Sequence, residues 1–161
     1  MASLEVGKVQ IYTGDGKGKT TAALGLALRY LLACELQNLC SAGLGRVAVG
    51  LYDAQTQTGR GIVFGAVQLL GKLKHEHVKS IARGAQVDVL ILDELGEAMR
   101  RGFVTREDME ALIAIKPATT ELVLTCRGLL PLADLADLVT EMRPVKHYFD
   151  EGLLARQGIE Y

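Results

Sequence analysis

Short runs of apolar residues recur along the chain, and longer stretches with a helical spacing of apolar residues separate most of them. The run VDVLIL at 87–92 is almost continuously apolar, which is typical of a strand that is buried on both faces of a parallel sheet. The pattern predicts strands at Lys8–Thr13, Arg46–Tyr52, Val87–Leu92, Glu121–Thr125 and Leu138–Met142.

The longer stretches predict helices. Thr105 is a candidate N-cap with Asp108 three residues further on, and Gly65 and Gly71 weaken the second predicted helix. The predicted helices are Lys19 to about Leu39, Ile62–Ala82, Thr105–Ile115 and Leu130–Ala136. Ser41–Gly45 and Asp53–Gly61 are predicted loops, and Arg143–Tyr161 is a tail with little regular pattern. Strands that alternate with helices predict an α/β fold with a mostly parallel sheet and helices on both faces. Since there is no repeat or interdomain linker, we expect residues 1–161 to form one domain.

The segment KVQIYTGDGKGKTT at 8–21 places a glycine-rich loop between the first strand and the first helix. The backbone N–H groups of such a loop and the helix N-terminus supply donors and partial positive charge to a polyphosphate. A lysine in this position reaches the phosphates, and the next threonine hydroxyl can bind Mg²⁺. The predicted nucleotide site comprises Gly14, Asp15, Gly16, Lys17, Gly18, Lys19, Thr20 and Thr21, with Thr20 as a metal ligand.

The loop departs from the usual phosphate-loop pattern G-x-x-x-x-G-K-[ST], whose first glycine would stand where this chain has Thr13. The first glycine is Gly14, so the spacing between the glycines is one residue shorter, and Lys17 adds a second cation inside the loop. A plain glycine turn is the alternative interpretation. It leaves Lys17, Lys19 and the threonine pair unexplained.

Polar residues also follow the later strands. Asp93 and Glu94 directly follow the apolar strand at 87–92. A protein that binds metal-bound ATP needs a carboxylate near Mg²⁺, so both residues are candidate metal ligands. The alternative interpretation is that they form a polar strand end without a ligand. Arg127 follows the strand ELVLT and therefore lies at the carboxyl edge of the sheet, where ligands bind in open α/β sheets. Its spacing fits a triphosphate contact and a surface arginine equally well. Arg29 is interpreted from its position as a partly buried salt-bridge residue.

Composition narrows the classes of function. The net charge is −1, with 18 Lys and Arg against 19 Asp and Glu, which argues against broad binding of nucleic acid or membrane surfaces. The most apolar stretch, Ala22–Leu36, contains Arg29 and Glu35 and is too short to span a bilayer. The first residues, MASLEVGK, lack the pattern of a signal peptide.

The cysteines and histidines predict neither a disulfide framework nor a metal centre. Cys34, Cys40 and Cys126 are odd in number and form no C-x-x-C pair. His75 and His77 are two residues apart, which places them on different faces of a helix. We therefore expect a reducing, cytoplasmic setting.

Four segments resemble the P-loop type of the cobalamin (corrinoid) adenosyltransferase family. They are YTGDGKGKTTAALGLALR at 12–29, DVLILDEL at 88–95, ELVLTCRG at 121–128 and DLVTEMRPVKHYFDEGLLARQGIEY at 137–161. The tail, with its RPVKH segment and its terminal GIEY, is the most specific of the four. The resemblance implies a three-layer P-loop NTPase fold of the RecA-like type.

The resemblance also implies a reaction, in which the 5′-deoxyadenosyl group of ATP passes to the cobalt of a reduced corrinoid and triphosphate is released. The family's shortened, lysine-rich loop is thought to bind ATP in reverse orientation, so that ribose C5′ is exposed. Cobalt(I) is itself the nucleophile, so no side chain acts as acid or base. Lys19 and Arg127 would position the leaving triphosphate, and Arg29 becomes a nucleotide contact. The implied partners are ATP, Mg²⁺, a corrinoid co-substrate, an electron donor such as a reductase, and a second copy in a homodimer.

The chain departs from that family in its middle. Residues 50–85 are shortened and lack the aromatic G-F-T-W motif that packs against the corrinoid, and the chain has no tryptophan. Phe64 or Tyr52 could substitute, with core packing as the alternative role. The segment YLLACELQNLC at 30–40 has no clear family counterpart, and Cys126 stands where the family usually has glycine. A P-loop NTP-binding or ATPase module without corrinoid alkylation is therefore the second hypothesis. A small-molecule kinase is disfavoured, because no arginine-rich lid segment is found.

Overall fold

The computed structural model describes residues 4–41, 61–66, 87–157 and 159. Within these residues five strands form one sheet in the order β2-β3-β4-β1-β5, and each neighbouring pair is parallel. The strands are β1 (Val9–Thr13), β2 (Gly61–Ala66), β3 (Val87–Asp93), β4 (Glu121–Thr125) and β5 (Leu138–Glu141). Because β4 lies between β1 and β3, its carboxyl end separates the glycine-rich loop after β1 from the carboxylates after β3.

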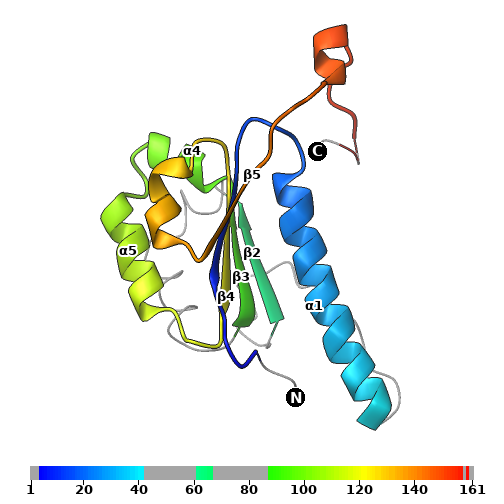
Figure 1. Cartoon of the computed structure of the whole chain (residues 1–161), viewed down its shortest axis with the longest axis vertical. Coiled ribbons are helices and arrows are strands. Elements are labelled where there is room, and N and C mark those ends of the chain that lie inside the picture. Colours follow the sequence, from blue (N-terminus) through cyan, green and yellow to red (C-terminus); the bar gives the residue numbers. More distant parts are fainter. Residues whose placement is uncertain (1–3, 42–60, 67–86, 158, 160–161) are drawn as a thin grey trace.

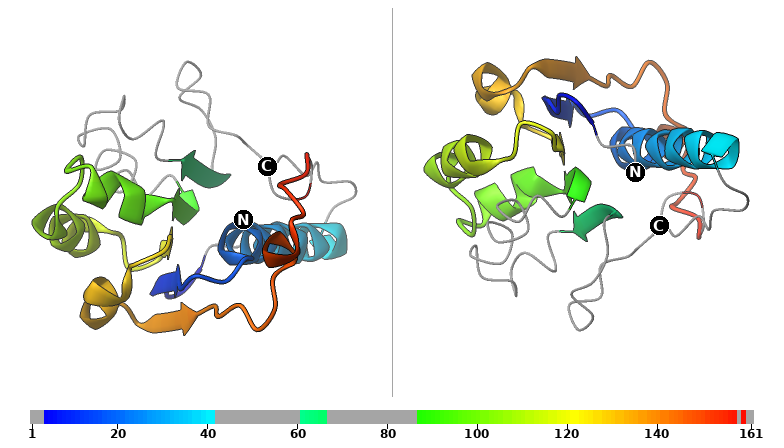
Figure 2. Two further views of the ribbon diagram at one scale, coloured as in Figure 1. Left: turned by 90° about the horizontal axis from the view of Figure 1, so that it is seen from above. Right: turned by 90° about the horizontal axis from the view of Figure 1, so that it is seen from below.

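Helices cover both faces of the sheet (Figure 1). Helix α1 (Lys19–Ser41) lies on one face, and α4 (Leu95–Arg100), α5 (Arg106–Ile115) and the 3₁₀ helix η1 (Leu130–Leu135) lie on the other. The views from above and below show the same two-sided arrangement (Figure 2). A second 3₁₀ helix, η2 (Tyr148–Glu151), belongs to the tail after β5. The predicted α/β fold with a parallel sheet is confirmed. Among the described residues, no helix has both the length and the apolar character needed to cross a membrane.

Alternate side chains of the central strands enter two cores, as the period of a β-strand requires. On one face Ala23 and Ala27 of α1 pack against Val89, Ile91 and Val123. The core on the other face lies beneath α4, α5 and η1, and it includes Leu90, Leu92, Met109, Leu112, Leu122, Leu124 and Leu132.

The structure confirms the strands predicted at 8–13, 87–92, 121–125 and 138–142, together with the first helix. The helix predicted at Ile62–Ala82 is wrong over residues 62–66, which form β2. The sequence IVF is β-branched and aromatic, two glycines flank it, and its backbone pairs with the buried strand β3. The remainder of that predicted helix and the strand predicted at Arg46–Tyr52 lie outside the described residues.

Among the helices of the second face, α5 begins with a capping box. The helix predicted at Thr105–Ile115 is α5, in which Thr105 accepts from the N–H of Asp108 at 3.2 Å and Asp108 accepts from the N–H of Thr105 at 3.0 Å. The helix predicted at Leu130–Ala136 is the 3₁₀ helix η1. Helix α4, directly after the carboxylates, was not predicted.

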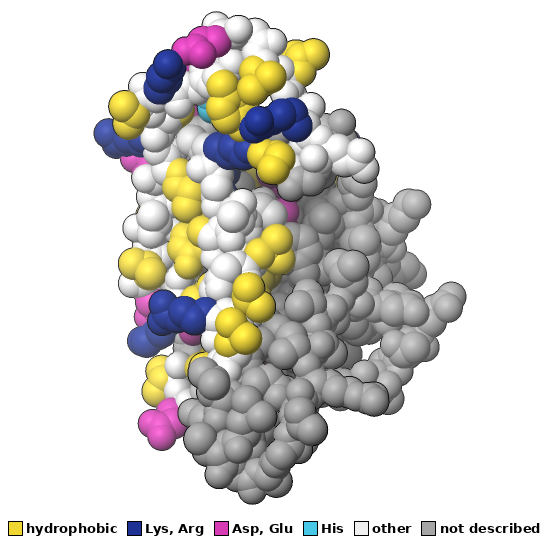
Figure 3. Space-filling view, turned by 90° about the vertical axis from the view of Figure 1, so that its right-hand side faces the viewer, with side chains coloured by type: hydrophobic (Ala, Val, Ile, Leu, Met, Phe, Trp, Pro, Cys, Tyr) yellow, Lys and Arg dark blue, Asp and Glu magenta, His cyan; other side chains and the backbone are white. Residues whose placement is uncertain are grey.

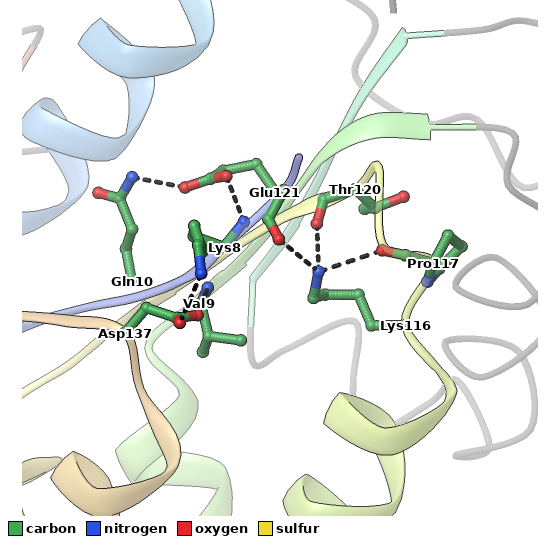
Figure 4. A network of polar contacts seen from close by, with 9 residues as sticks. Lys8, Val9, Gln10, Lys116, Pro117, Thr120, Glu121 and Asp137 are labelled. Carbon is green, nitrogen blue, oxygen red and sulfur yellow. Dashed lines mark hydrogen bonds and ion pairs between the residues drawn. The ribbon is translucent and has the colours of Figure 1, made fainter. Parts of the chain in front are cut away.

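Charged side chains close the amino edge of the sheet, away from the glycine-rich loop (Figure 4). The ammonium of Lys116 donates to the carbonyls of Gly7 and Pro117 at 3.1 Å and of Thr120 at 2.6 Å, and its burial lowers the pKa of Lys116. Lys116 thus ties the end of α5 to the start of β1 and of β4.

Two carboxylates bind the first N–H groups of β1 at the same edge. Glu121 accepts from the backbone of Lys8 at 2.7 Å, and Asp137 accepts from the backbone of Val9 at 2.8 Å. The N–H of Val9, followed by the ammonium of Lys8, lowers the pKa of Asp137. These contacts are structural, and they leave the opposite edge for ligand binding.

Candidate active site

The loop between β1 and α1 is shaped by its contact with the end of β5. The N–H of Met142 donates to the carbonyl of Thr13 at 2.8 Å, and the N–H of Gly16 donates to the carbonyl of Met142 at 2.7 Å. Gly14 has a φ of 94°, and a Cβ atom at Gly14 or Gly16 would overlap the backbone of Met142. The two glycines therefore allow the last strand to support the loop directly.

Lys19 is the first residue of α1, and it is only 8% exposed. Its ammonium donates to the carbonyls of Gly14 at 2.8 Å and Gly16 at 2.6 Å, so the side chain lies across the loop. Burial lowers the pKa of Lys19 below the usual 10.5, and the charge of Arg127 lowers it further, whereas Glu94 raises it. Lys19, Arg127 and Glu94 thus interact electrostatically at the carboxyl edge of the sheet.

The next residue, Thr20, connects the loop to β3. Its hydroxyl donates to Oδ1 of Asp93 at 2.8 Å, and Asp93 is only 7% exposed. Because the Thr20 hydroxyl uses its proton on Asp93, its oxygen lone pairs are available to a cation. The hydroxyl of Thr125, the last residue of β4, donates to the same carboxylate oxygen.

Hydroxyl and carboxylate oxygens of this kind suit Mg²⁺, which one or two carboxylates usually hold together with substrate phosphates. The described part of the chain contains no group of three or more His, Cys, Asp or Glu side chains that could hold a metal ion. The oxygens of Thr20 and Asp93 are of the type that binds Mg²⁺, and a nucleotide or water would have to supply the remaining ligands.

Glu94 is held in an unusual backbone conformation. It is the N-cap of α4 with φ 57° and ψ 30°, the left-handed region that favours glycine. Its exposed carboxylate accepts from the thiol of Cys126 at 3.3 Å. Burial, and then the hydrogen bond to Glu94, raises the pKa of Cys126, so the thiol keeps the proton that it donates.

The tail reaches the glycine-rich loop through one tyrosine. The ammonium of Lys17 donates to the hydroxyl of Tyr148 at 2.6 Å and lies 5.4 Å from the centre of its ring. The guanidinium of Arg156 lies 5.1 Å from the same ring centre. Tyr148 therefore connects η2 to a lysine that we expect to bind phosphate.

Three other predicted site residues, Asp15, Thr21 and Arg29, are exposed. Asp15 is exposed on the loop but acts electrostatically on Lys19, and Thr21 is exposed in the first turn of α1. Arg29 is also exposed, and the helix rise places it about 15 Å along α1 from Lys19, where its charge acts on Tyr12. The structure does not bring Arg29 to the loop.

Sequence reasoning missed Thr125, Tyr148 and the backbone of Met142. Thr125 carried a weak signal, because it is a polar residue at the end of an apolar strand directly before Cys126 and Arg127. The contacts of Met142 depend on β5 pairing with β1 and have no local sequence signal.

Comparison with known proteins points to one family. The family profile described as ATP:corrinoid adenosyltransferase BtuR/CobO/CobP matches residues 5–35 and 68–161. The match therefore extends beyond the segments at 12–29 and 88–161 and includes the loop, the carboxylate strand and the tail.

Curated relatives agree over almost the whole chain. Corrinoid adenosyltransferase CobA of Salmonella typhimurium is 29% identical over 99% of this chain and 88% of its own length. Corrinoid adenosyltransferase of Escherichia coli is 28% identical over 98% of this chain and 87% of its length. The protein of that name from Pseudomonas aeruginosa is 27% identical over 98% of this chain and 85% of its length.

Proposed function

Because the chain belongs to the ATP:corrinoid adenosyltransferase family, it is a transferase, and we propose that it adenosylates cob(I)alamin or a precursor corrinoid with ATP. The electron pair of cobalt(I) attacks ribose C5′, the C5′–O bond breaks, and its electrons leave on triphosphate. The observation that carries this proposal is the buried Lys19 at the head of α1, beside the Thr20–Asp93 pair.

The work of the protein in this reaction is positioning and charge stabilisation. The nucleophile carries no proton, so no general base is required. Lys17, Lys19, Arg127 and the N–H groups of the loop would bind the triphosphate, on which negative charge grows as the C5′–O bond breaks. Low exposure strengthens the contribution of Lys19, because water screens a buried charge less.

Other predicted residues have supporting roles in the proposal. Thr20, Asp93 and Glu94 would hold Mg²⁺, which neutralises part of the triphosphate charge when bound. The backbone at Gly14, Gly16 and Gly18 would form the loop around the phosphates. The charge of Asp15 raises the pKa of Lys19 and so favours its charged form. Thr21 and Arg29 remain proposed nucleotide contacts, with Arg29 the least supported because of its position along α1.

We also propose a cytoplasmic homodimer that receives electrons from a separate reductase. The face formed by α1 and the tail shows apolar side chains in Figure 3. Leu24, Leu28 and Leu32 are 44–47% exposed and are spaced four residues apart, so they share one face of α1. Light scattering should give a dimer mass for the natural protein and a monomer mass for Leu28→Glu. A dimer in both would mean that this face is not the interface.

One observation favours a second candidate function. The chain has no tryptophan and lacks the aromatic motif expected to contact the corrinoid. A P-loop nucleotide-binding or ATPase module would need the phosphate site alone.

An anaerobic assay with chemically reduced cob(I)alamin and MgATP separates the two functions. Cobalt alkylation is followed by absorbance, and the phosphate product is identified. Alkylation with triphosphate release supports the transferase, provided that Lys19→Ala abolishes it and Lys116→Ala, which changes a lysine at the opposite edge, retains it. Release of ADP and phosphate without alkylation, across several corrinoids, would support the ATPase instead.

A further inference from the structure

The carboxyl end of β4 contacts both carboxylate residues that follow β3. Leu92 pairs with Leu124 in the register of the two strands, which sets Asp93 beside Thr125. Thr125 is 1% exposed, and its hydroxyl donates to Oδ1 of Asp93. The same hydroxyl oxygen accepts from the N–H of Glu94 at 3.4 Å. One buried hydroxyl therefore contacts the side chain of Asp93 and the backbone of Glu94.

Asp93 receives a second hydroxyl on the same oxygen. Thr20 donates to Oδ1 at 2.8 Å from the first turn of α1. The terminal torsion of an aspartate is broad, so an aspartate without such contacts samples many carboxylate orientations. Donors from two elements on one oxygen fix that orientation, and they direct the other oxygen away from both hydroxyls.

Glu94 needs support for a different reason. Its left-handed backbone is unfavourable for a residue with a Cβ atom, so the surrounding structure has to maintain it. Thr125 binds its N–H, and the thiol of Cys126 binds its carboxylate at 3.3 Å. The last residue of β4 and the residue directly after it thus hold the backbone and the side chain of Glu94.

We propose that Thr125 is a positioning residue, which orients Asp93 and Glu94 toward a divalent cation bound to the nucleotide's phosphates. This inference rests on the proposed function, since it assigns Thr125 to the metal side of the same site. Because Thr125 is only 1% exposed, we assign it no direct contact with phosphate. Its removal should therefore affect the response to Mg²⁺ and leave the binding of metal-free ATP unchanged.

Thr125→Val keeps the shape of the side chain and removes the hydroxyl, and Thr125→Ser keeps the hydroxyl. Thr120→Val is the matched control, because Thr120 is equally buried, precedes the same strand and donates to a β3 carbonyl, that of Val87, at the opposite edge. The enhancement of ATP affinity by Mg²⁺ is measured by calorimetry with and without the metal. The Mg²⁺ dependence of kcat and KM is measured beside it.

The loss of a buried hydrogen bond to a charged group predicts that Thr125→Val raises the half-saturating Mg²⁺ concentration roughly tenfold or more. Thr125→Ser and Thr120→Val should stay near the natural protein. Equal Mg²⁺ shifts in Thr125→Val and Thr120→Val, or no shift in Thr125→Val, would overturn the proposal. If Thr125→Val does not fold, Thr125→Ala takes its place as the variant without the hydroxyl. An equally weak response to Mg²⁺ in Thr125→Ser and Thr125→Ala would then overturn the proposal. The calorimetric readout needs no corrinoid, so it decides this point even if alkylation is not observed.

Discussion

Replacing Lys19 with alanine separates nucleotide binding from folding. In the free protein the ammonium donates to the carbonyls of Gly14 and Gly16, and with ATP bound we expect it to face phosphate oxygens. Unit charges about 4 Å apart attract by ~4 kcal/mol at the effective dielectric constant near a protein surface. Exchange of one of the two carbonyl contacts for phosphate offsets part of this attraction, because a hydrogen bond to a charged group contributes about 1.5–3 kcal/mol. A net loss of about 1–2.5 kcal/mol remains, which weakens ATP binding roughly 5- to 70-fold.

The same substitution should cost little stability. The carbonyls of Gly14 and Gly16 lose a donor, but they belong to a loop at the edge of the sheet, where water can replace it. A loss of about 1 kcal/mol is expected, which lowers Tm by about 2–4 °C for a chain of this length.

Calorimetry with MgATP and thermal unfolding, on one set of variants, measure the two effects. Lys116→Ala is the matched control, because Lys116 also donates to backbone carbonyls but lies at the amino edge. It should lower Tm without changing the Kd for ATP. If Lys19→Ala binds ATP within about threefold of the natural protein, less than one charged hydrogen bond contributes and the phosphate-loop interpretation is wrong.

Three further predictions follow from the same edge of the sheet. Glu94→Gln should slow the Mg²⁺-dependent reaction, and an unchanged rate at every Mg²⁺ concentration would mean that Glu94 does not serve the metal. Because the pKa of Lys19 is lowered, Lys19 is fully charged below that pKa and loses its charge as the pH rises through it, so the affinity for ATP should fall over the same range. In Lys19→Arg the side chain stays charged, and the affinity should not fall. An affinity for ATP, measured by calorimetry, that is constant up to pH 10.5 would contradict this prediction. Tyr148→Ala removes the contacts to Lys17, so trypsin should cleave the tail faster than in Tyr148→Phe, which keeps the ring; equal cleavage would show that other contacts hold the tail.

Local sequence signals predicted the elements that have strong local patterns. The glycines and Lys19 marked the phosphate loop, and the apolar run at 87–92 marked the buried strand β3. Thr105 and Asp108 marked the start of α5 through a capping box. In each case the residues that define the element are neighbours in the chain, so the pattern is visible without the fold.

The missed features depend on tertiary structure. The backbone of GIVFGA at 61–66 pairs with β3, and this pairing overrides a weak helical pattern. The left-handed backbone of Glu94 has no signal in a glutamate, because it is imposed by the contacts with Thr125 and Cys126. Arg29 shows the opposite case. The resemblance assigns it to the nucleotide, and this stays a prediction, because Arg29 lies about 15 Å along α1 from Lys19.

The contact between Met142 and the glycine-rich loop has a consequence for biosynthesis. Thr13 and Gly16 leave the ribosome well before their backbone partner Met142, which directly follows the last strand of the sheet. Contacts so distant in sequence form late, because the intervening chain has to be ordered first. A nascent chain that stops before β5 holds every residue of the loop but lacks the strand that supports it. We therefore expect ATP to bind only after β5 has been translated. ATP would then bind to the folded sheet and would not assist its folding.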